Sequence, residues 1–202
     1  MKRLLLITIL LGVSAGHADS PLTSTDFYRA YNGLPLVQRA AKTRTLSDTM
    51  SRYLSNPKHP IGIKAAVINA LSWNSQGKTN ALKYRQFLAT RYKTSGRMLN
   101  LTQLNSHELF SLGYMSAMDD YRRPARGLRM LQKAREKNAR SYTIAIVTAL
   151  VQAQQSMDSD WCKTWYVTQQ VKEQAGLNRD LREGAIKIIF DYMALYKKYC
   201  DR

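Results

Sequence analysis

Hydrophobic positions recur at helical spacing along the whole chain, and no segment shows the strict alternation of apolar and polar residues that is typical of a β-strand. Residues 179–200 show the strongest pattern, because their apolar side chains follow the i, i+4, i+7, i+8 spacing of one helix face. Residues 142–155 are apolar almost all round, which is typical of a central buried helix. The pattern therefore predicts an all-α fold.

Capping residues, prolines and glycines divide the chain into about eight to ten predicted helices. Ser106, Ser141 and Asn178 are predicted to cap three of them, and Asp158 or Ser159 a fourth. The predicted helices are 25–31, 36–42, 48–54, 61–73, 80–92, 107–121, 124–138, 142–155, 160–175 and 179–200. Because short loops join consecutive helices, we expect an irregular array of antiparallel helical hairpins, similar to a helical-repeat protein.

Residues 19–202 are predicted to form a single helical domain, with two subdomains that meet near residues 93–101 as the alternative. Small residues that align between helices lie 47, 32 and 40 positions apart, so no fixed repeat length holds. The unit 109–140, with Leu112-Gly113-Tyr114 and Ala125, resembles a tetratricopeptide hairpin, although its later aromatic and alanine positions depart from that pattern. The segment 60–80, which includes KAAVINALSWNSQGK, resembles an uncharacterised family of exported bacterial helical proteins and implies no function.

The N-terminus has the composition of a secretory signal peptide. Lys2 and Arg3 precede an apolar run, 4–13, and Gly16 and Ala18 occupy the −3 and −1 positions of a cleavage site. The run is too short to span a bilayer, and no cysteine follows it to carry a lipid. We therefore predict that residues 1–18 are cleaved and that the mature chain is periplasmic or secreted, without a transmembrane segment; a retained N-terminal anchor is the alternative.

The chain is strongly basic, with a formal net charge of +17 that falls to +15 when Lys2 and Arg3 are removed. Such an excess favours acidic partners and anionic surfaces. An exported protein rarely meets nucleic acid, so we expect no nucleic-acid partner and consider instead an acidic protein, anionic lipid or an anionic cell-wall polymer. The alternative is that the charge only keeps the protein soluble.

Both cysteines, Cys162 and Cys200, lie in the C-terminal quarter, and an even count in an oxidising compartment predicts one disulfide. Two straight antiparallel helices, 160–175 and 179–200, would place these cysteines about 12 Å apart along the helix axis, which is too far for a bond. We therefore expect the last helix to end early or helix 160–175 to be offset. The alternative is an intermolecular disulfide.

Aromatic residues are concentrated near these cysteines. Tyr192, Tyr196 and Tyr199 lie on the core-facing side of the last predicted helix, and Trp161 and Trp165 are four residues apart in the helix before it. Tyrosine is favoured at interfaces, but this spacing favours ordinary packing in the core.

Catalytic and metal-binding motifs are absent from the sequence. The mature chain has two histidines, His59 and His107, and neither has the spacing of a metal site or of a catalytic triad. Asp119 and Asp120 are adjacent in sequence, so they are predicted to act in a turn rather than as a pair facing across a cleft. We expect no enzyme activity, no metal and no cofactor, with an unrecognised hydrolase assembled from distant residues as an alternative.

The most distinctive feature is a basic segment, 122–140, which contains eight cations and one acid, Glu136. Arg126, Arg129, Lys133 and Lys137 are spaced to form one stripe on a helix, and Leu128, Leu131 and Ala134 lie on another face. Like charges at i, i+4 destabilise a helix, so the stripe favours a docking surface. The predicted partner-binding residues are Arg122, Arg123, Arg126, Arg129, Lys133 and Lys137. The alternative is a solvated face that is simply basic.

These features predict a non-enzymatic interaction protein that binds an acidic protein partner through the basic helix. In size, compartment and helicity the chain resembles the periplasmic antitoxins that neutralise delivered cell-wall-degrading effectors, such as the type VI amidase immunity proteins. The resemblance rests on no shared motif, and it implies an immunity protein whose partner is a secreted effector. The alternative is a periplasmic protein that associates with anionic cell-wall polymer or lipid.

Overall fold

The computed structural model of the chain describes residues 20–72, 79–157 and 159–200. The predicted signal peptide, 1–18, and Asp158, one of the predicted caps, lie outside these ranges. The described residues form nine α-helices and two 3-10 helices, and they contain no strand. The predicted all-α fold of eight to ten helices is therefore confirmed. None of the described helices is long and apolar enough to cross a bilayer.

The helices follow the boundaries predicted from capping and periodicity, apart from those at the two ends of the chain. The elements are η1 (Phe27–Tyr31), α1 (Pro35–Thr43), α2 (Asp48–Ser55), α3 (Ile61–Leu71), α4 (Asn80–Arg91), α5 (Ser106–Asp119), α6 (Ala125–Lys137), α7 (Tyr142–Ser156), α8 (Trp161–Glu173), α9 (Glu183–Met193) and η2 (Ala194–Tyr199). The first predicted helix is a short 3-10 helix, η1.

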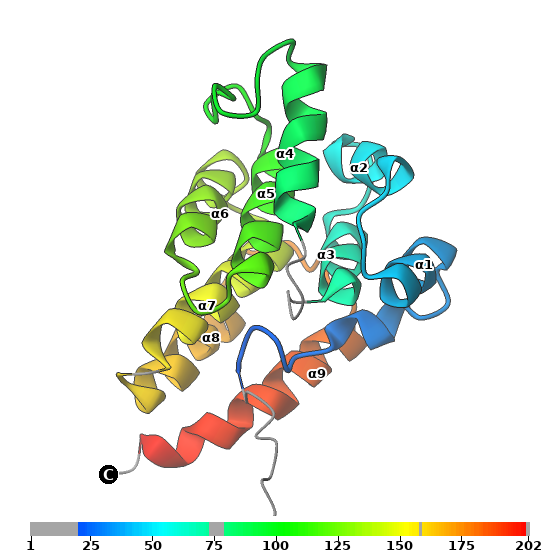
Figure 1. The fold of residues 1–202 in the computed structure, drawn as a ribbon. Coiled ribbons are helices and arrows are strands. Elements are labelled where there is room, and N and C mark those ends of the chain that lie inside the picture. Colours follow the sequence, from blue (N-terminus) through cyan, green and yellow to red (C-terminus); the bar gives the residue numbers. More distant parts are fainter. Residues whose placement is uncertain (1–19, 73–78, 158, 201–202) are drawn as a thin grey trace, which may run out of the picture.

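From α4 to α8 each helix packs against the next one in the chain, so the predicted hairpin array is present (Figure 1). The most extensive contacts join α5 to α6 and α7 to α8. The last helix, α9, leaves this array and packs against η1 near the start of the chain (Figure 1). The buried hydrophobic side chains form one cluster that extends from Leu22 to Tyr196.

The α5–α6 hairpin is held by a close contact between two glycines. A Cβ atom at Gly127 would lie 2.6 Å from the carbonyl oxygen of Gly113, and one at Gly113 would lie 2.9 Å from the carbonyl oxygen of Gly127. Cβ atoms essentially never approach other atoms so closely. The two backbones therefore touch only because both positions lack a side chain. Gly113 belongs to the segment that resembles a tetratricopeptide hairpin.

The cap of α5 differs from the one predicted. Asn105, rather than Ser106, accepts a hydrogen bond from the backbone N–H of Glu108 at 3.0 Å, and the Glu108 carboxylate accepts one from the Asn105 N–H at 3.0 Å. This reciprocal pair is a capping box. Asn105 is the cap in place of Ser106 because a capping box requires the acidic residue three positions after the cap, and Glu108 lies three positions after Asn105.

The last helix begins later than predicted. Asn178, its predicted cap, instead pairs with the backbone before α7: its N–H donates to the Arg140 carbonyl at 2.7 Å, and its carbonyl accepts from the Tyr142 N–H at 3.2 Å. Two residues on, Asp180 accepts hydrogen bonds from the Ser141 hydroxyl and the Thr143 N–H. Residues 174–182 are thus a non-helical connector with a turn at 175–176, and α9 starts only at Glu183.

This connector explains how Cys162 and Cys200 form a disulfide, with their Cα atoms 4.7 Å apart. α8 begins at Trp161, after the cap Asp160 rather than the predicted Ser159. Because the connector moves α9 away from α8, it is η2 that packs against α8 and brings Cys200 to the first turn of that helix. The offset between the two helices removes the predicted separation of about 12 Å.

Aromatic residues adjoin both cysteines of the disulfide, since Trp161 precedes Cys162 and Tyr199 precedes Cys200. The ring of Trp161 lies 4.9 Å from that of Tyr199 and 5.7 Å from that of Tyr196. Tyr196 is buried, as predicted, but Trp161 is 41% exposed, contrary to its predicted core position. Trp161 is the first residue of its helix, where one side of the ring has no neighbouring turn to cover it.

We expect Gly127→Ala to destabilise the fold by about 1–3 kcal/mol, because α6 must move away from α5 to accommodate the methyl group. Thermal or denaturant unfolding measures the change. Gly33→Ala is the matched control, because a Cβ atom there meets nothing within 4 Å. Equal stability of the two variants would contradict the close contact.

Removing the disulfide, by reduction or by the double change Cys162→Ala and Cys200→Ala, should lower the free energy of unfolding by up to about 4 kcal/mol, because the unfolded chain is no longer cross-linked. Unfolding curves with and without reductant measure the loss, and reductant should leave the double variant unchanged. A dimer on a non-reducing gel would instead indicate an intermolecular bond.

Candidate functional site

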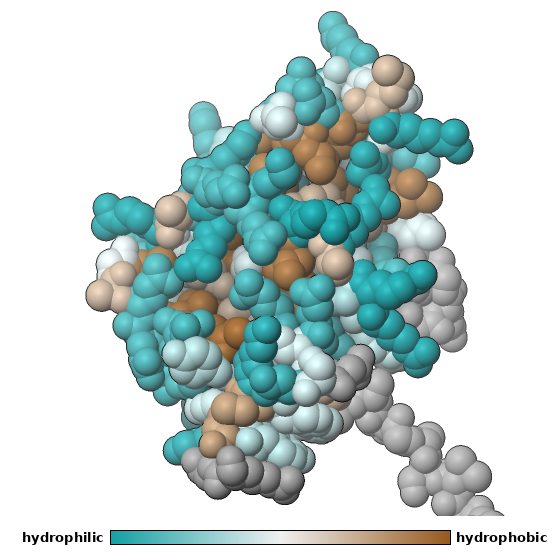
Figure 2. All heavy atoms as spheres, turned by 90° about the vertical axis from the view of Figure 1, so that its left-hand side faces the viewer, coloured by the Kyte–Doolittle hydropathy of each residue, from teal (hydrophilic) through white to brown (hydrophobic). Residues whose placement is uncertain are grey.

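The predicted basic stripe lies on the outward side of α6. Leu131 and Ala134 are fully buried, whereas Arg126, Arg129 and Lys133 are exposed. Figure 2 views the side of the molecule that carries this helix and shows hydrophilic side chains projecting over the face, with hydrophobic residues visible between them. The periodicity of α6 therefore presents a row of cations to solvent.

The six predicted partner-binding residues have different surroundings. The guanidinium of Arg122 lies 5.9 Å from the centre of the Tyr121 ring, and Arg123 pairs with Asp120 at 3.2 Å. Lys137 donates to the carbonyls of residues 102 and 104, at 2.8 and 2.7 Å, and so ties the loop before α5 to the end of α6. Lys137 therefore has a structural role. Among the described residues, Arg129 and Lys133 have no side-chain hydrogen bond or ion pair.

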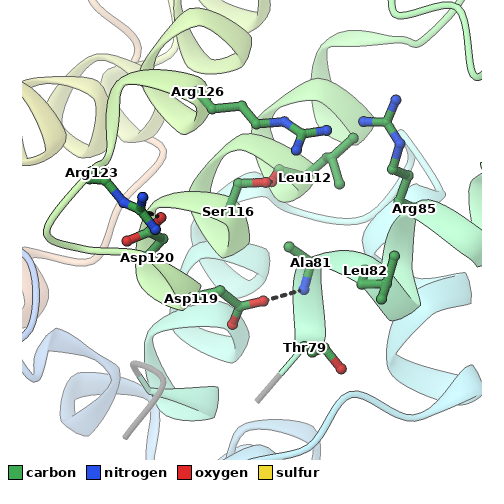
Figure 3. A pocket seen from close by; sticks show the side chains of 10 residues that line it. All are labelled: Thr79, Ala81, Leu82, Arg85, Leu112, Ser116, Asp119, Asp120, Arg123 and Arg126. Carbon is green, nitrogen blue, oxygen red and sulfur yellow. Dashed lines mark hydrogen bonds and ion pairs between the residues drawn. The ribbon is translucent and has the colours of Figure 1, made fainter. Parts of the chain in front are cut away.

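Arg126 lines a recess of about 290 Å³ between α4, α5 and α6 (Figure 3). Leu112 and Ser116 of α5 form its floor, and Arg85 of α4 lies across from Arg126. The complete lining is Thr79, Ala81, Leu82, Arg85, Leu112, Ser116, Asp119, Asp120, Arg123 and Arg126. The recess thus combines apolar walls with three arginines and two acids.

A second recess continues from the first along α4 toward the loop 93–98. The two share Leu82, Arg85 and Arg126, and the second adds Arg97. We call the combined surface, lined by Leu82, Arg85, Arg97, Arg123 and Arg126, the basic groove. Leu82 is 51% exposed within it, so the groove offers an apolar contact as well as positive charge.

The side chain of Arg85 is held in place by the loop. Its Nε–H donates to the Gly96 carbonyl at 2.5 Å, which leaves its terminal amino groups toward the recess (Figure 3). Burial lowers the pKa of Arg85, and the positive charge of Arg126 lowers it further. Both side chains line the same recess, so their positive charges repel each other.

Both acids of the recess are engaged in the fold. Asp119 accepts a hydrogen bond from the Ala81 N–H at 2.8 Å and so caps the start of α4, where Thr79 forms no side-chain cap (Figure 3). Asp120 pairs with Arg123 just before α6. Their role in helix termini agrees with the predicted turn function, and Asp119 in addition joins two helices.

The sequence alone does not indicate that Arg85 and Arg97 belong to the site. Arg85 lies on the predicted helix 80–92, some forty residues before Arg126, and no local pattern connects the two arginines. Both α4 and α6 pack against α5, and their packing brings Arg85 and Arg126 to the same recess.

The histidines lie outside the groove. His59 stacks on Tyr53, with ring centres 4.2 Å apart. His107 contacts Lys64, a fully buried lysine whose ammonium also donates to the carbonyls of Leu54 and Asn56, at 2.9 and 2.6 Å. The described residues contain no group of three or more His, Cys, Asp or Glu side chains that could hold a metal ion.

Burial shifts the protonation of this pair. It lowers the pKa of Lys64 to about 7, partly opposed by the nearby Glu108 carboxylate. Burial and the charge of Lys64 lower the pKa of His107 to about 4. Neither side chain lines the basic groove, so the pair acts within the core, where it joins α3 to α5 and to the end of α2.

The buried lysine predicts a pH dependence of stability. Between pH 7 and the unfolded value of 10.5, the unfolded chain binds a proton at Lys64 that the folded chain does not, so stability rises with pH in this window. Below pH 7 both states are protonated, and the contribution of Lys64 is constant.

Denaturant unfolding at several values between pH 7 and 9 should show this rise, by roughly 1 kcal/mol per pH unit. The rise should disappear in Lys64→Met and persist in Lys83→Met, which changes an exposed lysine on α4. An unaltered slope in Lys64→Met would contradict the assignment.

No family model matches the chain, and neither curated proteins nor solved structures give a match. The candidate site is therefore defined by the geometry and charge of this chain alone.

Proposed function

We propose that this protein is an exported interaction protein that binds an acidic protein partner through α6 and the basic groove. The observation that supports the proposal is a row of exposed cations, Arg126, Arg129 and Lys133, that no acid of the described chain neutralises and that leads into the groove. An unneutralised row costs helix stability, and an acidic partner would offset that cost.

Some cations elsewhere on the surface are paired with acids on the same helix or turn. Arg29 pairs with Asp26, Arg179 with Glu183 and Lys187 with Asp191, each at a spacing of three or four residues. Such pairs are the ordinary way in which a helical surface accommodates charge. Among the described residues, the cations within α6 form no ion pair, and the same holds for exposed cations elsewhere, such as Arg39, Lys42 and Lys163. The α6 face differs from these in that its cations are aligned along one helix and border the basic groove.

The shape of the face favours a protein over a flat anionic surface. The groove is concave, and Leu82 is half exposed inside it. Met98, on the loop 93–98 that borders the groove, is 77% exposed. A protein partner can bury these apolar side chains while its acidic residues meet the arginines, whereas a lipid headgroup layer or a wall polymer offers charge without a matching protrusion.

An immunity protein against a delivered toxin is the specific form of this proposal. The basic face would cover the toxin, and the disulfide between Cys162 and Cys200 suits an oxidising compartment outside the cytoplasm. The alternative is association with anionic cell-wall polymer or lipid.

Affinity capture with the tagged mature protein in its native periplasm tests the proposal. A variant with Arg126→Glu, Arg129→Glu and Lys133→Glu changes the α6 face. The matched control, Arg39→Glu, Lys42→Glu and Lys163→Glu, changes three exposed cations on α1 and α8 by the same total charge.

Wild type and control should each capture one stoichiometric acidic protein, and the α6 variant should lose it. The purified partner should then bind the α6 variant at least about tenfold more weakly than wild type. Recovery of wall fragments or lipid that dissociate with salt would support the alternative. Capture of the same protein by the α6 variant would contradict the proposal.

A further inference from the structure

Arg85 and Arg126 form a pair of like charges from two different helices. Their guanidinium groups lie at the same side of the recess, above Leu112 and Ser116 of α5 (Figure 3). The acids that line the recess do not separate them, since Asp119 caps α4 and Asp120 pairs with Arg123. Two cations that line one recess repel each other, and an anion between them would relieve the repulsion.

One of the two arginines, Arg85, is oriented before any ligand binds. The bond from the Nε–H of Arg85 to the Gly96 carbonyl fixes the plane of its guanidinium and leaves the terminal amino groups for another acceptor. Arg126 has no hydrogen bond or ion pair of its side chain among the described residues. Arginine binds carboxylates through two parallel hydrogen bonds, and prior orientation reduces the entropy lost on binding.

The residues that line the recess favour a carboxylate on an aliphatic side chain over other anions. Ala81, Leu82 and Leu112 supply apolar surface beside the arginines, which suits an acidic group on a short aliphatic stem. Asp119 and Asp120 line the same recess, and their negative charges disfavour a dianion such as phosphate. The first recess has a volume of about 290 Å³ and opens into the second, of about 620 Å³, so a side chain of a protein partner can enter while the residues next to it occupy the rest of the groove.

We infer that Arg85 and Arg126 together form a carboxylate site, which receives a glutamate or aspartate side chain of the acidic protein partner. The inference rests on the proposed function and adds the anchoring point of the interface. A buried acid held by two arginines at the centre of a groove has the character of an interface hot spot, whereas Arg129 and Lys133 on the open face act through longer-range attraction.

Titration of the mature protein followed by NMR of the arginine Nε–H groups tests the site without a partner. The probe is N-acetyl-glutamic acid α-amide, which carries one carboxylate, and the neutral N-acetyl-glutamine amide is its control, both at constant ionic strength. Saturable shifts at Arg85 and Arg126 are expected with the glutamate probe only. Shifts of equal size with the glutamine probe or with chloride would overturn the site, and tighter binding of inorganic phosphate would overturn its assignment to carboxylate.

Two variants locate the binding. Arg85→Gln should abolish the saturable shift of Arg126, because a carboxylate then has one arginine in place of two. Arg129→Gln should leave the shifts of Arg85 and Arg126 unchanged, because Arg129 does not line the recess. Thermal unfolding of both variants checks that the fold is intact. Saturable binding that persists in folded Arg85→Gln would overturn the inference.

The captured partner separates this inference from the proposed function. Arg85→Gln should weaken binding of the partner by about tenfold or more, as expected for loss of a charged hydrogen bond. If Arg85→Gln binds normally while the α6 variant does not, the carboxylate site is wrong and the proposed function stands. If the glutamate probe binds at Arg85 and Arg126 but no acidic protein is captured, the site stands and the proposed function is wrong.

Discussion

The contact between α5 and α6 determines where the basic groove lies. Gly113 and Gly127 let the two backbones touch, and the residues of the groove adjoin them: Leu112 precedes Gly113, and Arg126 precedes Gly127. A side chain at either glycine would push α6 outward and carry Arg126 away from Arg85. The geometry of the candidate site therefore depends on two positions that contribute no side chain to it.

The two acids that line the recess also stabilise the ends of neighbouring helices. Asp119 caps α4 across a helix boundary, and Asp120 holds Arg123 at the start of α6. Asp119 is thus committed to the start of α4 and Asp120 to Arg123, and neither forms an ion pair with Arg85 or Arg126. The consequence is a recess in which Arg85 and Arg126 meet without a carboxylate between them.

Lys64 and His107, unlike the arginines of the groove, are titratable groups placed inside the core. Lys64 lies fully within the core, where two backbone carbonyls and His107 accept or share its protons. Burial makes the charged forms costly and lowers the pKa of both groups. The lowered pKa values of Lys64 and His107 thus follow from their burial in the core. The positive charge of the groove comes instead from arginines at the surface.

Local patterns in the sequence determined the helical class, most helix boundaries, the outward cations of α6 and the pairing of the two cysteines, because periodicity and capping act over short range and the chain has only two cysteines to pair. The tertiary structure alone decided the late start of α9, since Asn178 and Asp180 bind the beginning of α7 and neither caps α9. It also decided that Lys137 holds a loop and that Arg85 joins Arg126. The start of α9, the contact of Lys137 and the placement of Arg85 depend on which helices pack together and how closely. Side-chain volumes at contacts between residues far apart in the chain set this packing.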